Sequence, residues 1–172
     1  MGWRTHMGYF HKTMSLDQRF RFSFEGFLDD LEVEGLRFAL GDCRRDLTRE
    51  WELWRTGRTW QPQSGLPTTD PNGWEPSGKI VTRVKPGSGM GPHFYGLAGD
   101  VYPEDENGQL MTTKHEAWKA TIARFWELAE ARGLDALGHR EDVPEDEYWS
   151  EDPCHFQATG WRSMRPAHAQ EV

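Results

Sequence analysis

The feature that most constrains the fold is the stretch 91–101, which places a histidine and an aspartate seven positions apart. His93 follows a loop rich in glycine, proline and serine, and Asp100 precedes a Val-Tyr pair typical of a strand. Neutral imidazole and carboxylate are ligands that Zn²⁺ prefers in tetrahedral sites. Two ligands do not complete such a site, and we expect His155 to supply a third. The fold must therefore bring distant segments together.

Around these residues the sequence reads H-x-x-G-x-A-x-D and, far downstream, D-x-x-H-F. Further blocks precede them: Arg45, residues 53–59 (L-W-R-T-G-R-T) and residues 78–82 (G-K-I-V-T). This order resembles that of the LAS metallopeptidases, which cleave the peptide stems of bacterial cell walls. Within that group the sequence is most similar to the phage and bacterial L-alanyl-D-glutamate endopeptidases and their D-alanyl-D-alanine carboxypeptidase relatives. The resemblance spans about residues 36–157 in family order.

We hypothesise that His93, Asp100 and His155 hold Zn²⁺, with water in the fourth position. A catalytic zinc leaves one position open, whereas a structural zinc closes it with protein groups. Three strong ligands without a convincing fourth favour the catalytic kind. Cys154 is a competing ligand, but neighbouring side chains of an extended segment point to opposite faces.

Hydrolysis also needs a group that carries a proton from water to the leaving amine. The resemblance assigns this role to Asp152, three residues before His155, with Glu151 as the second choice. The alternative is that Asp152 only caps or forms a salt bridge. The resemblance also implies a substrate contact for Arg45, whose fork of donors suits a carboxylate or carbonyl; a surface salt bridge is the alternative. Gly91 departs from the family, which has Ser or Thr there.

The resemblance implies zinc-dependent hydrolysis of a peptide bond in the peptidoglycan stem. The first hypothesis is an L-Ala-D-Glu endopeptidase that acts as a phage endolysin. The alternatives are a D-Ala-D-Ala carboxypeptidase of the same family and, from another class, a non-catalytic zinc-containing cell-wall binding protein. A phage enzyme would stay in the host cytoplasm until a holin-type partner releases it to the cell wall. We expect a monomer.

Charge and hydropathy argue against other classes of partner. The net charge of -8 would repel a phosphate backbone, so we expect no nucleic acid. No apolar run approaches the roughly 18–20 residues that cross a bilayer. The basic residues near the start are not followed by an apolar stretch, so we expect neither a signal peptide nor membrane insertion.

Hydrophobic periodicity and the resemblance predict an α+β fold, in which a small antiparallel sheet carries the zinc site and about three helices flank it. The helices are expected near residues 16–34, 46–56 and 114–132. Strands are expected near residues 36–40 and 79–84. Capping boxes that begin at Ser15 and Thr113 mark the starts of the first and third helices.

Three polar segments lack a regular pattern. Residues 1–13 are expected to be a disordered extension or tag, which leaves 14–172 as a single catalytic domain. Residues 60–77 are rich in turn-forming residues and are expected to be irregular, either as a functional lid or as a surface insertion. Acidic residues crowd the segment 141–152, which we expect to be solvated, with a Ca²⁺ site as the alternative.

Overall fold

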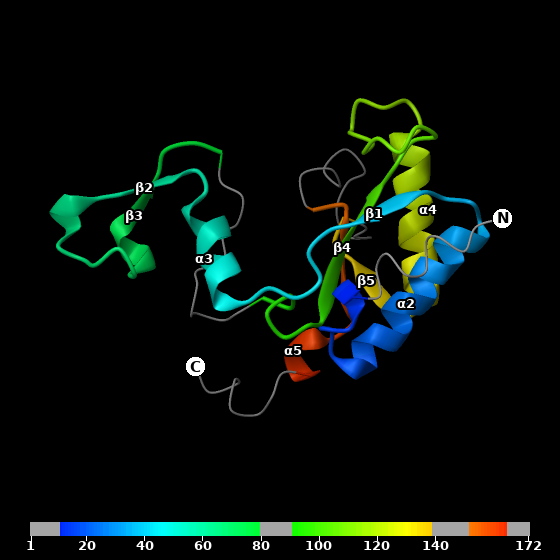
Figure 1. Ribbon diagram of the computed structural model, residues 1–172, viewed down its shortest axis with the longest axis horizontal. Coiled ribbons are helices and arrows are strands. Elements are labelled where there is room, and N and C mark those ends of the chain that lie inside the picture. Colours follow the sequence, from blue (N-terminus) through cyan, green and yellow to red (C-terminus); the bar gives the residue numbers. More distant parts are fainter. Residues whose placement is uncertain (1–10, 80–90, 139–151, 165–172) are drawn as a thin grey trace.

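The computed structural model describes residues 11–79, 91–138 and 152–164 (Figure 1). It contains a four-stranded antiparallel sheet in the order β1-β4-β6-β5, which confirms the predicted small antiparallel sheet. The strands are β1 (Phe38–Leu40), β4 (Ala98–Pro103), β6 (His155–Ala158) and β5 (Leu134–Ala136). No helix within the described ranges has the length and apolarity that a bilayer crossing requires.

Two amphipathic helices, α2 (Gln18–Val33) and α4 (Trp118–Ala131), lie together against one side of this sheet (Figure 1). The aromatic stripe expected of the first helix is buried: Phe20, Phe24, Phe27, Leu28 and Leu31. The Phe27 ring contacts Phe156 of β6 and Phe125 of α4, with centroid distances of 4.8 and 6.3 Å. The core therefore lies between these helices and the sheet. The described residues also contain the α-helices α3 (Leu47–Arg55) and α5 (Trp161–Met164) and the short 3-10 helices η1 (Pro62–Ser64) and η2 (Pro71–Gly73).

The three expected helices are present with slightly shorter bounds, but both predicted caps are wrong. Asp17 caps α2, since its carboxylate accepts from the Arg19 N–H at 3.0 Å, while the Ser15 hydroxyl donates to a preceding carbonyl. Tight turns occupy the segment after Thr113, and α4 begins only after Ala117, which makes no side-chain capping bond. Turns occupy both places instead: the Leu16 N–H donates to the Thr13 carbonyl at 2.9 Å, and the His115 N–H donates to the Thr112 carbonyl at 2.8 Å.

Residues 60–77 are more regular than expected. The strands β2 (Arg58–Trp60) and β3 (Trp74–Pro76) form an antiparallel hairpin in which Trp60 pairs with Trp74. Each indole N–H donates to a carbonyl of the intervening loop, Trp60 to Leu66 and Trp74 to Thr68. These bonds tether a loop that its turn-forming residues alone would leave irregular. The hairpin projects from the body of the protein beyond α3 (Figure 1).

The domain boundary expected at residue 14 stays a prediction, but two residues just before it contact the rest of the described chain. Thr13 is fully buried, and its hydroxyl donates to the Glu25 carboxylate at 2.7 Å. Lys12 donates to the carbonyls of Leu40 and Gly41, so the segment packs against the domain. Residues 1–10, nearly all of the strand expected at 79–84, and the acidic segment up to residue 151 lie outside the described residues.

Candidate metal centre

The predicted ligands gather on the face of the sheet opposite α2 and α4. Asp100 of β4 and His155 of β6 are direct partners in the antiparallel register, so their side chains share one face. The residues that follow them, Val101 and Phe156, face the opposite way and are fully buried in the core. His93 lies in the turn before β4. All three residues are buried, with only 2–8% of each residue exposed.

The donor atoms of this cluster lie nearly equidistant from one another. His93 Nε2 is 3.0 Å from Asp100 Oδ1 and 3.0 Å from His155 Nδ1, and the last two atoms are 3.2 Å apart. Ligand atoms of a tetrahedral zinc site with bonds of about 2.0–2.1 Å are separated by about 3.3 Å. The three residues form a group able to hold a metal ion within the described parts of the chain.

The outer nitrogen of each imidazole has an acceptor that fixes its proton. His93 Nδ1–H donates to the Cys43 carbonyl at 2.9 Å, and His155 Nε2–H donates to Gln157 Oε1 at 3.2 Å. In the neutral rings the inner nitrogens then present lone pairs to each other and to the Asp100 carboxylate. Such an arrangement needs a positive charge at its centre, and the donor set fits Zn²⁺.

Protons and a metal ion compete for this cluster. Burial alone would raise the pKa of Asp100, but hydrogen bonds from His155 and His93, formed when an inner nitrogen is protonated, lower it by more. The carboxyl group therefore stays ionised. A metal ion binds only to histidine nitrogens and carboxylates that carry no proton. We therefore expect the cluster to bind a cation more weakly as the pH falls.

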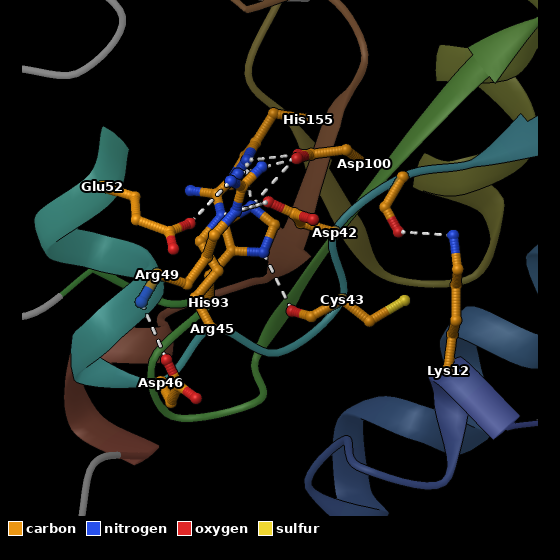
Figure 2. A network of polar contacts seen from close by, with 11 residues as sticks. Lys12, Asp42, Cys43, Arg45, Asp46, Arg49, Glu52, His93, Asp100 and His155 are labelled. Carbon is orange, nitrogen blue, oxygen red and sulfur yellow. Dashed lines mark hydrogen bonds and ion pairs between the residues drawn. The ribbon is translucent and has the colours of Figure 1, made fainter. Parts of the chain in front are cut away.

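Arg45 lies beside a predicted ligand. Its Nη2 donates to Asp100 Oδ2 at 2.8 Å and its Nε donates to Asp42 Oδ2 at 3.0 Å (Figure 2). The contact uses the Asp100 oxygen that points away from the histidines, so Oδ1 stays within the cluster. The substrate contact expected of Arg45 stays a prediction.

Asp152 is exposed, and its backbone carbonyl accepts from the His155 N–H at 3.2 Å. Partial desolvation raises the pKa of Asp152, and the negative charge of Asp100 raises it further, against smaller opposing effects of the histidines. Glu151 lies outside the described residues. The Cys154 thiol is buried, and it does not belong to the cluster formed by the described residues.

Two glycines that the sequence analysis did not single out allow aromatic rings to pack closely beside the site. A Cβ on Gly99 would lie 2.3 Å from Phe24 Cζ, so only glycine lets this ring of α2 pack beside Asp100. A Cβ on Gly41 would lie 2.5 Å from a ring carbon of Tyr102. Gln157 and Asp42 were also missed, although Gln157 stands two positions after His155 on the same strand face, a spacing that sequence alone provides.

No protein-family model and no curated protein matches the chain. Among solved structures it is similar to the Serratia marcescens L-Ala D-Glu endopeptidase ChiX, with a TM-score of 0.51, 14% identity, and coverage of 86% of this chain and 84% of that one. It is also similar to a variant of the vancomycin resistance D,D-pentapeptidase VanY in complex with Zn(II), with a TM-score of 0.51, 14% identity, and coverage of 85% and 74%. The chain therefore has the fold of the LAS-type peptidoglycan peptidases, which confirms at the level of the fold the resemblance inferred from its sequence.

Proposed function

We propose that the protein is a zinc-dependent peptidase that hydrolyses a peptide bond in the peptidoglycan stem. The observation that supports this most strongly is the convergence of His93, Asp100 and His155 donor atoms at 3.0–3.2 Å on a sheet of this fold. A zinc ion held by these three residues would polarise the scissile carbonyl and acidify a water molecule. The protein must then move the proton of that water.

Asp152 is the residue we assign to this transfer. It takes a proton from the attacking water and gives one to the leaving amine, which requires both access to the substrate and a pKa not far below the working pH. Its exposed side chain supports the first requirement. The upward shift of its pKa by desolvation and by Asp100 favours the second.

Arg45 is proposed to orient the substrate. Its Nε and Nη2 are engaged by Asp42 and Asp100, while Nη1 has no hydrogen-bond partner among the described residues. One guanidinium donor beside the cluster is therefore available to a carbonyl or carboxylate of the peptide stem.

The first hypothesis for the bond cleaved is L-Ala-D-Glu, and the alternative is the terminal D-Ala-D-Ala bond. Both hypotheses can be tested by digesting purified cell walls with the zinc-loaded protein and identifying the products by mass spectrometry. New amino termini on D-Glu support the endopeptidase, and free D-Ala supports the carboxypeptidase. Zinc binding without cleavage of any wall type would contradict the peptidase hypothesis and support the non-catalytic cell-wall binding protein instead.

A phage endolysin is the setting we propose for the endopeptidase, with a monomeric catalytic domain that waits in the host cytoplasm for a holin-type partner. Expression in a bacterial host should then cause lysis only when a holin is co-expressed. Lysis at the same rate without the holin would contradict this setting and leave the peptidase assignment intact.

A further inference from the structure

One short segment, residues 41–45, binds two of the three predicted ligands. Its contacts are Gly41 N to Asp100 O at 2.8 Å, Asp100 N to Asp42 O at 3.0 Å, His93 Nδ1 to Cys43 O at 2.9 Å, and Arg45 N to His93 O at 3.2 Å. The Arg45 side chain adds the bond to Asp100 Oδ2. Backbone and side chain of this segment therefore set where both ligands lie.

The Asp42 carboxylate holds Arg45 in place. Asp42 Oδ2 accepts from Arg45 Nε at 3.0 Å and from Arg49 Nε at 3.4 Å, and Arg49 in turn pairs with Glu52 at 3.1 Å. Figure 2 shows Arg49 and Glu52 on α3, on the side that faces the histidines. The Arg45 side chain is 18% exposed and that of Asp100 only 3%. The contact between them is thus shielded from solvent.

The direction of the Arg45 fork decides which oxygen of Asp100 remains free. A guanidinium facing a carboxylate tends to bind both oxygens in parallel. Here Nε is committed to Asp42, so only Nη2 reaches Asp100, and it reaches Oδ2. Oδ1 is left to face His93 and His155.

The charges around Asp100 also indicate that Asp42 favours a cation in the cluster. A cation in the cluster and the Arg45 guanidinium would both contact Asp100, and like charges that close repel each other. The negative charge of Asp42, whose side chain is 35% exposed, offsets the positive charge of Arg45 next to the buried Asp100 carboxylate.

We propose that Asp42 is a positioning residue of the metal centre, which acts through Arg45 to keep Asp100 Oδ1 open to the metal. This rests on the metal site of the proposed function and does not depend on which bond is cleaved. Partners of metal ligands change metal affinity by about 10–100-fold when they are removed. We therefore expect Asp42→Asn to weaken zinc binding about tenfold.

The test is a competition titration of the full chain with zinc and a chromophoric chelator. Glu52→Gln is the matched control, because it also removes an acid that pairs with Arg49 but has no contact with Arg45. It should bind zinc as the wild type does, and Asp42→Glu should recover part of the affinity. Circular dichroism and thermal melts of the metal-free proteins establish that each variant is folded.

A double variant separates positioning from a general charge effect. In the Arg45→Gln background, Asp42→Asn should cause no further loss of affinity, because its effect passes through Arg45. A full additional tenfold loss, or equal affinities of Asp42→Asn and wild type, would overturn the proposal. A wild-type protein that binds no zinc would instead overturn the metal centre and the proposed function together.

Discussion

Asp100 and His155 face each other directly across the β4–β6 pair, with Oδ1 and Nδ1 3.2 Å apart. The register that brings them together also sends Val101 and Phe156 into the core. A slip of one residue would exchange the two sets, which would turn Asp100 and His155 toward the apolar core and the apolar side chains toward the candidate site. The hydrophobic core therefore fixes the geometry of the candidate metal centre.

Removing a predicted ligand should abolish metal binding but leave the fold intact. We expect His155→Ala to reduce bound zinc from one ion per chain to nearly none, because two ligands do not hold the ion. Metal analysis after dialysis measures this. His115→Ala, which changes a histidine outside the cluster, should retain a full equivalent of zinc. Equal zinc contents in the two variants would contradict the assignment.

Asp152→Asn should separate catalysis from metal binding. We expect kcat on purified peptidoglycan to fall by about 10²–10⁴-fold, the usual contribution of a general acid–base, while zinc affinity changes little. The neighbouring Glu151→Gln is the control and should stay close to wild-type activity. If Glu151→Gln loses the activity and Asp152→Asn keeps it, the roles of the two acids are reversed.

Gly99 and Gly91 should respond very differently to an added methyl group. Gly99→Ala forces its Cβ against the Phe24 ring and should destabilise the protein by about 1–3 kcal/mol. The Cβ of Gly91→Ala meets no atom of the described residues within 4 Å, and this substitution should be close to neutral. Urea unfolding of both variants measures the difference. A similar loss in both would mean that close packing of α2 on β4 is not the cause.

Stability should decrease on the acid side partly through ion pairs between α2 and α4. Arg132 donates to both oxygens of Asp30 at 2.6 Å, and Arg124 pairs in the same way with Glu34. These bonds hold the pKa of Asp30 and that of Glu34 below their ordinary values of 3.8 and 4.5. Their contribution is present above those values and is lost as the pH falls through the lowered ones.

The matching measurement is the melting temperature between pH 7 and pH 2, in wild type and in Asp30→Asn. The variant should be slightly less stable at neutral pH and should lose less on acidification. High salt should reduce the difference, because both pairs are partly exposed. Parallel pH profiles of the two proteins would contradict this role of Asp30.

Local patterns predicted much of the fold. The spacing of Phe20, Phe24 and Phe27 fixed the buried face of α2, because apolar periodicity reports burial directly. The hairpin at residues 60–77 was not predictable in this way, since it depends on indole N–H bonds to its own loop. Thr13 was placed outside the domain because its partner, Glu25, is a long-range contact that no local pattern reveals.

In the candidate site, the three candidate ligands were predictable from the sequence, but the groups that orient them were not. Residue chemistry together with the resemblance pointed to His93, Asp100 and His155, and the structure brings them together. Their role as ligands stays a prediction. The partners that orient them were not predicted, because a backbone carbonyl such as that of Cys43 carries no sequence signal. Asp42 is one acid among many in an acidic chain, and only the fold shows that it faces Arg45.

The most direct test of the metal centre is anomalous diffraction at the zinc edge from crystals of the zinc-loaded protein. We predict one zinc ion bound by His93 Nε2, His155 Nδ1 and Asp100 Oδ1 at about 2.0–2.2 Å, with the Cys43 and Gln157 bonds to the outer nitrogens intact. Zinc bound elsewhere, or no zinc between these three atoms, would contradict it.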